Sequence, residues 1–334
     1  MIFRSSKATL HIKRLQSGGL ITNYYCTSRC GHCLYNCSPQ WEKKYIDEET
    51  TRGNLEKIKA LSCRSIHIGG GEPLLYPQGL ARVLVQARET AVAVEYVETN
   101  SSWYKNKDSA VALLEGLKEQ GLATLLISIS PFHNEHIPFY KVKGVIEACR
   151  IAGVSIFPWI REFIPEVDAL DDRMPHKPAD YAERFGQNYL KKIPNRYWVR
   201  FGGRALKTYE GILTPKDLQT LLRSNSGGCS ELADVTHFHL DLFGNYIPGL
   251  CSGLAIHRND LGTPISSAQY PILSMLFTSG INALLEMAVT RFEFRPAERY
   301  LSKCHLCTTI RSWLVLEKNL ESKELQPKGF YENW

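Results

Sequence analysis

Apolar runs that end in polar loops alternate with amphipathic stretches from about residue 18 to residue 205. The apolar runs are Leu20–Tyr25, Ser65–Ile68, Val92–Val97, Thr124–Ile129, Val154–Ile160 and Trp198–Phe201. The stretches between them have a helical period, at Asp47–Leu61, Gln78–Thr90, Ser109–Gln120, Lys141–Ala152 and Ala179–Lys192. Strand and helix signals that alternate at this spacing predict parallel β/α units and an α/β fold.

The pattern changes after Gly202-Gly203-Arg204-Ala205. The runs Val235–Leu242 and Asn245–Leu250 flank a Phe-Gly-Asn turn and predict a hairpin. Helical patterns follow at Tyr270–Phe277 and Ile281–Met287, and the charged tail from Glu317 is expected to pack loosely. We therefore expect an extension at residues 1–17, a large α/β core at 18–205 and a smaller α+β domain at 206–334.

Composition narrows the class of protein. The chain has 334 residues, of which 44% are hydrophobic, enough to bury a sizeable core. Its net charge of +6 comes from dispersed Lys and Arg, which indicates a solvated surface and does not indicate a nucleic-acid partner. No apolar run approaches the roughly 18–20 residues of a membrane span, and Met1–Lys13 lacks a signal-peptide core. We expect a cytoplasmic protein without a membrane partner.

Ten cysteines without a secretory signal favour metal or redox chemistry over disulfides. Cys26, Cys30 and Cys33 form a Cys-x-x-x-Cys-x-x-Cys run directly after the first apolar run. Three thiolates this close can hold three corners of a cubane iron–sulfur cluster and leave the fourth iron open. The alternative is a zinc site, with Cys37 or His32 as the fourth ligand.

A second motif, Gly69-Gly70-Gly71-Glu72-Pro73, follows the second predicted strand. Glycines let the backbone approach a ligand closely. Together with the cysteine run, this motif resembles the radical S-adenosylmethionine (SAM) superfamily, which has an aromatic residue where this chain has His32. The resemblance implies an incomplete (β/α)6 barrel, a SAM-binding [4Fe-4S] cluster, and a backbone at Gly70, Gly71 and Glu72 that holds the SAM amino group.

Further polar residues follow the later strands. The resemblance implies SAM contacts for Asn100, Ser128 and Ser130, and the alternative is that they are ordinary strand caps. Arg161 and Arg200 could pair with a carboxylate of the cofactor. His133 and His136 could orient a substrate or move a proton.

Four cysteines lie in the second half: Cys229, Cys251, Cys304 and Cys307. Four thiolates form a closed site for zinc or for a second [4Fe-4S] cluster. The segment Asp241–Cys251 resembles the hairpin of SPASM and Twitch extensions, which implies an auxiliary cluster with four cysteine ligands. His237, His239 and Asp241 alternate and so share one strand face, as a proton relay or as the polar face of an ordinary hairpin.

The resemblance implies an enzyme that cleaves SAM to a 5′-deoxyadenosyl radical, which takes a hydrogen from a C–H bond of a peptide or small molecule. The auxiliary cluster accepts an electron or positions the substrate, and flavodoxin or ferredoxin supplies the reductant. If Cys37, Cys63 or Cys149 lines the cavity, its thiol could donate a hydrogen atom and make the reaction an epimerisation. The other interpretations are a two-cluster electron carrier and a zinc-stabilised binding module.

The start of the sequence bears on the substrate. About 25 residues precede Cys26, which is too few for a winged-helix peptide-recognition domain or a cobalamin-binding domain. This weakens the peptide interpretation and makes cobalamin-dependent methyl transfer an unfavoured reaction.

Overall fold

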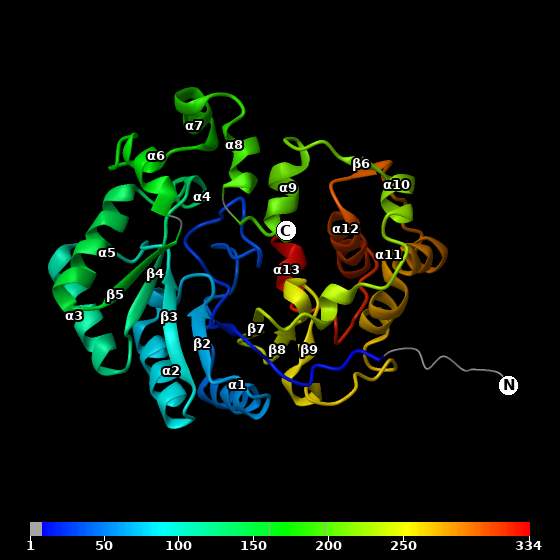
Figure 1. Cartoon of the computed structure of the whole chain (residues 1–334), viewed down its shortest axis with the longest axis horizontal. Helices are drawn as coiled ribbons and strands as arrows, with labels where there is room; N and C mark the ends of the chain where they lie inside the picture. The colour runs from blue at the N-terminus through cyan, green and yellow to red at the C-terminus, as the bar shows by residue number, and fades with distance from the viewer. Residues whose placement is uncertain (1–8, 160, 197) are drawn as a thin grey trace.

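One twisted sheet of eight strands organises the chain. A computed structural model describes residues 9–159, 161–196 and 198–334. The strands are β1 (Gly18–Ile21), β2 (Ser65–Gly69), β3 (Ala93–Thr99), β4 (Thr124–Ser128), β5 (Ser155–Trp159), β7 (Phe238–Asp241), β8 (Asn245–Ile247) and β9 (Ile256–His257). Their order is β5-β4-β3-β2-β1-β7-β8-β9, with parallel pairing from β5 to β7 (Figure 1). The α/β prediction is confirmed, and the sheet is open.

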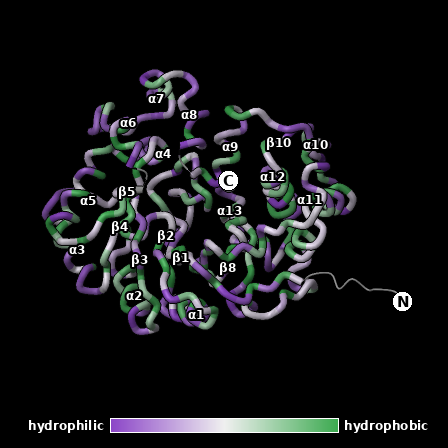
Figure 2. The backbone as a smooth tube through the Cα atoms, viewed as in Figure 1, coloured by the Kyte–Doolittle hydropathy of each residue, from purple (hydrophilic) through white to green (hydrophobic). Residues whose placement is uncertain are grey.

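Helices cover the outer face of the parallel strands (Figure 1). They are α1 (Glu48–Ala60), α2 (Pro77–Glu89), α3 (Lys107–Glu119) and α5 (Phe139–Ala152), whereas the short α4 (Pro131–Asn134) lies beyond the carboxyl end of β4 (Figure 1). The Asp47 carboxylate accepts a hydrogen bond from Thr50 N at 2.7 Å and so starts α1, which buries Leu55 and Ile58. Apolar residues of the strands and of these helices form one buried core. The hydropathy colouring of the backbone shows that hydrophobic residues are frequent along the strands (Figure 2).

Two predictions at the end of the first half are wrong. Trp198–Phe201 forms no strand, and β7 instead continues the sheet beside β1. The helix expected at residues 179–192 is divided into α7 (Pro178–Phe185) and α8 (Tyr189–Lys192), because Gly186 has a φ of 100° that ends α7. Ile160, the last residue of the fifth predicted strand, lies outside the described residues. A short helix, α6 (Ile164–Asp168), precedes α7.

The second half contains the predicted hairpin and a group of helices. β7 and β8 pair antiparallel, which confirms the hairpin, and the two-stranded sheet of β6 (Lys216–Asp217) and β10 (Arg299–Tyr300) lies apart from the main sheet. The helices are α9 (Arg204–Glu210), α10 (Leu218–Arg223), α11 (Pro271–Phe292), α12 (Lys303–Leu316) and α13 (Lys328–Glu332). Because β7 pairs with β1, the second half shares the main sheet, and the boundary at residue 205 stays a prediction.

Helix α11 is the one described helix that is long and apolar enough to cross a membrane, by its 22 residues and its composition. Gly280 interrupts it with a φ of 75° and a ψ of −161°, which matches the two separate helical patterns in the sequence. Leu273, Leu276 and Leu284 are buried. A broken helix with a buried face is typical of a protein core, so its length alone is weak evidence for a membrane.

The C-terminal tail packs tightly, and the prediction of loose packing is wrong. Leu325, Phe330 and Tyr331 are each at most 2% exposed. The buried Glu324 carboxylate accepts hydrogen bonds from Ile272 N at 2.8 Å and Leu273 N at 2.7 Å. These two donors lie in the first turn of α11, where the backbone N–H groups have no partner within the helix.

Candidate functional site

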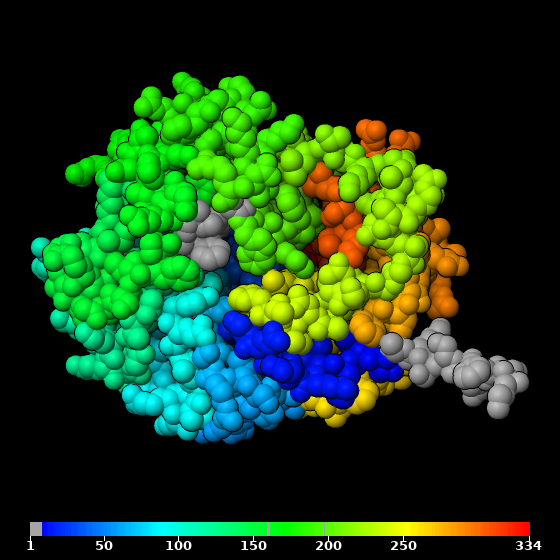
Figure 3. Space-filling model, in the orientation of Figure 1, coloured from blue at the N-terminus to red at the C-terminus, as the bar shows by residue number. Residues whose placement is uncertain are grey.

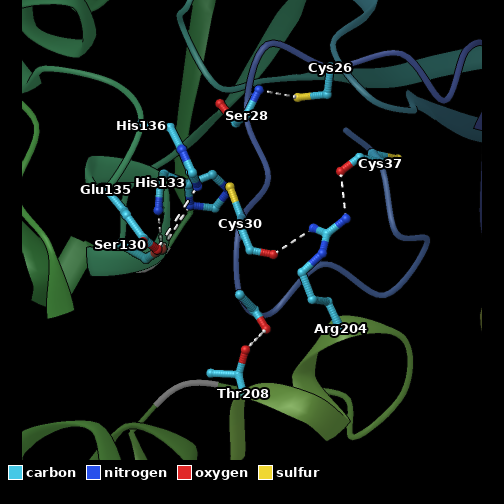
Figure 4. A network of polar contacts seen from close by, with 11 residues as sticks. Cys26, Ser28, Cys30, Cys37, Ser130, His133, Glu135, His136, Arg204 and Thr208 are labelled. Atoms are coloured by element: carbon cyan, nitrogen blue, oxygen red, sulfur yellow. Dashed lines mark hydrogen bonds and ion pairs between the residues drawn. The ribbon is translucent and has the colours of Figure 1, made fainter. Parts of the chain in front are cut away.

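The loop after β1 carries the first cysteine set, and α9 holds this loop in place. Arg204 donates to the carbonyls of Cys30 at 2.8 Å and Cys37 at 3.0 Å (Figure 4). Arg204 N also donates to Cys33 O at 3.0 Å. Thr208, one turn later on α9, donates to Gly31 O at 2.7 Å. These bonds connect residues more than 160 positions apart and fix the loop before any ligand binds.

Cys26, Cys30 and Cys37 in this loop are buried and Cys33 is partly buried, and all ten cysteines of the chain are free. Burial raises the pKa of Cys26 to about 12 and that of Cys30 well above its usual range. The pKa of Cys33 is lowered to about 6 because the Cys37 thiol donates a hydrogen bond to it. A buried thiolate is stabilised by a bound cation, so this set has the chemistry of a metal or cluster site.

The glycine run after β2 packs directly on the residues that precede the cysteines. A Cβ atom at Gly71 would lie 2.0 Å from Tyr25 O, and Gly71 N donates to Asn23 O at 2.7 Å. Gly70 has a φ of 152°, and a Cβ there would lie 2.6 Å from Asn23 Oδ1. The close approach therefore requires glycine and places the backbone of the run beside the cysteine loop.

The Glu72 side chain is an internal acceptor. It is fully buried and accepts hydrogen bonds from Leu74 N at 3.1 Å, Thr99 Oγ1 at 3.0 Å and Asn100 N at 2.6 Å. Burial raises its pKa to about 7, although these donors act in the opposite direction. The carboxyl group thus ties the glycine run to the end of β3, and only the backbone of Glu72 is available to a ligand.

The structure brings most of the predicted residues around one cavity of about 280 Å³. The predicted residues that line it are Cys26, Cys30, Cys33, Cys37, Gly70, Gly71, Glu72, Asn100, Ser128, His133 and Arg200. Asn100 Nδ2 donates to Cys26 Sγ at 3.3 Å, so this side chain supports the cysteine set. His32 also lines the cavity and stacks on Phe132 with ring centroids 4.7 Å apart.

Three predicted residues do not line this cavity. Ser130 is the N-cap of α4, and its hydroxyl lies 2.7 Å from His133 Nδ1 (Figure 4). His136 lies beside Glu135, with 3.9 Å between the imidazole and carboxylate atoms. Arg161 is exposed. Ser130 is therefore a cap, as the alternative interpretation predicts, and it contacts the cavity-lining His133. Burial lowers the pKa of His133 to about 4.

The second cysteine set lines another cavity, of about 310 Å³. Cys229, Cys251, Cys304 and Cys307 all lie on its wall, although 78 residues separate the first from the last. The surface is hollowed between α9 and α12, where this cavity lies (Figure 3). The buried Arg311 guanidinium donates to Ser252 O at 2.9 Å and Thr308 Oγ1 at 3.1 Å, and its charge interacts with Cys251 and Cys307.

The two cavities share a wall. Arg200 and Leu250 line both of them. Arg200 Nη2 donates to Gly249 O at 2.9 Å, which anchors the segment before α9 to the loop before Cys251. The two cavities that hold the cysteine sets are therefore neighbours.

The alternating face of β7 contributes two histidines and a structural aspartate. Asp241 accepts hydrogen bonds from Tyr24 Oη at 2.9 Å and Asn245 N at 2.9 Å and is fully buried, so it fixes the hairpin turn. His237 and His239 line the first cavity together with Glu98. His67 on β2, which no sequence motif marked, lies against His239 with 2.8 Å between their Nε2 atoms.

Cys63 and Cys149 lie away from the two cavities. The Cys63 thiol donates to Ser65 O at 3.1 Å, and Cys149 is fully buried in α5. Of the three cysteines without a predicted ligand role, only Cys37 lines the first cavity. A thiol that donates a hydrogen atom to a substrate therefore has only Cys37 as a candidate.

Residues 20–157 match the family model described as the radical SAM superfamily. Among solved structures, the chain is similar to native anSMEcpe with bound AdoMet, at 13% identity over 90% of this chain and 98% of that chain, with a TM-score of 0.45. It is similar to BtrN in complex with AdoMet and 2-DOIA, at 13% identity over 80% of this chain and 89% of that chain, with a TM-score of 0.43. It is also similar to Streptococcus suis SuiB bound to S-adenosylmethionine, at 14% identity over 80% of this chain and 66% of that chain, with a TM-score of 0.34. A comparison with curated proteins found no match.

The open α/β sheet, the thiols after β1 and the glycine run after β2 define a SAM-dependent iron–sulfur enzyme. Residues 20–157 form a radical SAM domain by their match to the superfamily model. The family implies a [4Fe-4S] cluster and SAM as cofactors.

Proposed function

We propose that the protein uses the first cavity to abstract a hydrogen atom from a C–H bond of a substrate, and the second cysteine set to take up the electron that the substrate radical releases. When bound, SAM and the first cluster supply the 5′-deoxyadenosyl radical. Cys26, Cys30 and Cys33 hold that cluster. The backbone of Gly70, Gly71 and Glu72 binds the amino group of SAM.

The observation that carries this proposal is the common wall of the two thiol-lined cavities, made by Arg200 and Leu250. An electron acceptor next to the reaction cavity suits an oxidation, in which the substrate radical loses an electron to the acceptor and a proton to a base. Four cysteines leave no iron of a second cubane open to a substrate. Electron transfer therefore fits the second site better than substrate binding does.

The spread of the thiols favours clusters over zinc at both sets. Sulfurs around a single zinc ion lie roughly 3.8 Å apart, because each Zn–S bond is about 2.3 Å. Among the residues that the structure describes, the one group compact enough for a single ion consists of histidines, and neither cysteine set is drawn together in that way. The cavities of about 280 and 310 Å³ provide room for a larger group.

The first cavity fits a small polar substrate or a single side chain of a peptide. Arg200 offers a positive charge to such a group, and Glu98 offers a carboxyl group whose pKa burial raises to about 7. Trp198 lines the cavity and is 59% exposed, so it is available to cover a substrate at the entrance. Arg204 and α9 keep the cysteine loop in position during the reaction.

The test measures 5′-deoxyadenosine formed from SAM with dithionite after anaerobic reconstitution. We expect the wild type to form it and Cys30→Ala to form none. Cys304→Ala should keep the first cluster, lose about four of roughly eight iron atoms per chain, and still cleave SAM. Absence of 5′-deoxyadenosine from wild type with intact clusters contradicts the enzyme proposal. Loss of SAM cleavage in Cys304→Ala with the first cluster intact contradicts the division of roles between the two sets.

A further inference from the structure

Three imidazoles meet beside the first cavity, and two of them, those of His237 and His239, line it. His67 comes from β2, His239 comes from β7, and His237 directly precedes β7. One ring nitrogen from each histidine lies within 4.8 Å of the other two, and the ring centroids are 4.9 to 5.2 Å apart. No other group of three or more His, Cys, Asp or Glu among the described residues is this compact.

Gly19 is the reason that the imidazoles can meet. It lies on β1 between the two outer strands, in register with His67 on one side and His239 on the other. A Cβ at Gly19 would lie 2.6 Å from the His67 ring. The missing side chain leaves a gap over β1, and the two Nε2 atoms close this gap at 2.8 Å. The contact therefore follows from the strand order and from one glycine.

The environment suits neutral imidazole, the form that binds metals. His67 is 2% and His239 is 7% exposed. Burial lowers the pKa of all three rings, to about 3 for His67. His239 Nδ1 lies 2.7 Å from the Tyr35 hydroxyl, so its second nitrogen is fixed from behind, as is usual for histidine ligands.

A carboxylate lies next to the cluster. Glu98 Oε1 is 3.7 Å from His67 Nε2, and a Cβ at Gly69 would lie 2.8 Å from Glu98 Oε2. A divalent cation beside this carboxyl group would favour its ionised form. His237 is only partly buried and precedes the strand, so rotation of its side chain can bring its nitrogen to the roughly 3.3 Å spacing of ligands around one tetrahedral ion.

We propose that His67, His237 and His239 bind one divalent transition-metal ion, with Glu98 as the nearby carboxylate and an open position that faces the first cavity. Three histidines with one open position are typical of catalytic rather than structural metal sites. The open position would hold an oxygen or nitrogen group of the substrate. This role rests on the proposed function, whereas the metal site itself does not.

The experiment uses the full chain with both cysteine sets loaded with iron and Zn²⁺ as the probe. Equilibrium dialysis with metal analysis should give one zinc per chain. Absorption at the zinc edge should show nitrogen or oxygen neighbours at about 2.0–2.1 Å and no sulfur at about 2.3 Å. His237→Ala and His239→Ala should lose the zinc, and Glu98→Gln should weaken binding by roughly tenfold.

The matched control is His11→Ala, which removes an imidazole that lies 3.1 Å from Gly262 O, and which should keep one zinc per chain. His239→Ala could impair folding, because this side chain is buried. The His237→Ala variant removes a half-buried side chain, and the wild-type absorption spectrum needs no variant, so both test the site independently of such a defect. Three results would overturn the proposal: the iron-loaded wild type binds no zinc, the bound zinc has sulfur neighbours, or His237→Ala retains the zinc. The His67–His239 contact would then be only a hydrogen bond. 5′-Deoxyadenosine formation in the same samples shows separately whether the proposed function holds.

Discussion

At the scale of single residues, the first cavity depends on positions where two backbone segments lie too close together for a Cβ atom to fit between them. Gly71 is the strictest case, because a Cβ there would lie 2.0 Å from Tyr25 O. The neighbouring atom is backbone and belongs to the segment just before Cys26. A methyl group at Gly71 must therefore displace either the SAM cradle or the cysteine loop.

We predict that Gly71→Ala weakens SAM binding by about tenfold to a hundredfold, since such overpacking costs about 1–3 kcal/mol. The measurement is SAM affinity of the reconstituted protein by calorimetry. The matched control is Gly116→Ala in α3, where a Cβ would meet nothing within 4 Å. This control should keep SAM affinity and raise stability by roughly 0.5–1 kcal/mol. Equal SAM affinity in wild type and Gly71→Ala would contradict the assigned cradle.

Single residues also show how far sequence reasoning reaches. The cysteine run and the glycine run are local motifs, and the structure places both on the first cavity. His67 could not be found in this way, because its contact with His239 depends on the register of three strands and on Gly19 between them. Ser130 and Arg161 were predicted from their positions after strands. Side-chain direction decides such cases, and here it turns Ser130 towards the backbone of α4.

At the scale of elements, the wrong predictions have a common cause. The apolar residues of Trp198–Phe201 include Phe201, which lines the second cavity, and Trp198, which lines the first, and the segment is not a strand. An apolar run shows burial or contact but does not distinguish a sheet from a cavity wall. The two patterns within α11, in contrast, predict the interruption at Gly280 correctly.

The interruption of α11 shapes the second cysteine site. A Cβ at Gly280 would lie 2.0 Å from Gly227 O, and Cys229 N donates to Leu276 O at 2.8 Å. The break in the helix thus makes space for the loop that presents Cys229. A regular helix through residue 280 would displace this loop from the cavity.

We predict that Gly280→Ala lowers the iron content by about four atoms per chain while SAM cleavage is retained. The cause is the positive φ of 75° together with the contact to Gly227, which an alanine cannot accommodate without strain. Iron analysis and 5′-deoxyadenosine formation are the two measurements. Gly211→Ala, where a Cβ meets nothing within 4 Å, serves as the control with full iron. Full iron in Gly280→Ala would show that the break does not position Cys229.

At the scale of the whole molecule, the C-terminal segment connects the two cysteine sites. Asn36 Nδ2 donates to Phe330 O at 2.8 Å, and Ser38 Oγ donates to Asn333 Oδ1 at 2.6 Å, next to the first set. Arg311, beside the second set, donates to the Tyr331 hydroxyl at 3.1 Å. The charge and polarity of the tail predicted loose packing. This prediction was wrong because the few apolar residues that pack are too sparse to form a recognisable pattern in the sequence.

We predict that deletion of residues 328–334 destabilises both clusters. The deletion removes the buried Phe330 and Tyr331, and loss of one such aromatic side chain typically costs about 3–5 kcal/mol. It also exposes the loop around Asn36 and the guanidinium of Arg311. The measurement is the rate of iron release to a chelator, which should rise for both clusters together, with a lower apparent melting temperature.

The matched control is the double variant Lys328→Ala/Glu332→Ala, which removes an exposed ion pair at 3.4 Å on the same segment. Exposed pairs contribute about 0–1 kcal/mol, so iron release should stay at the wild-type rate. Faster release from only one cluster in the truncated chain would mean that the segment supports that site alone. Unchanged release from both would mean that α1 to α12 hold the two sites without it, and that the contacts of Phe330 and Tyr331 serve the fold only.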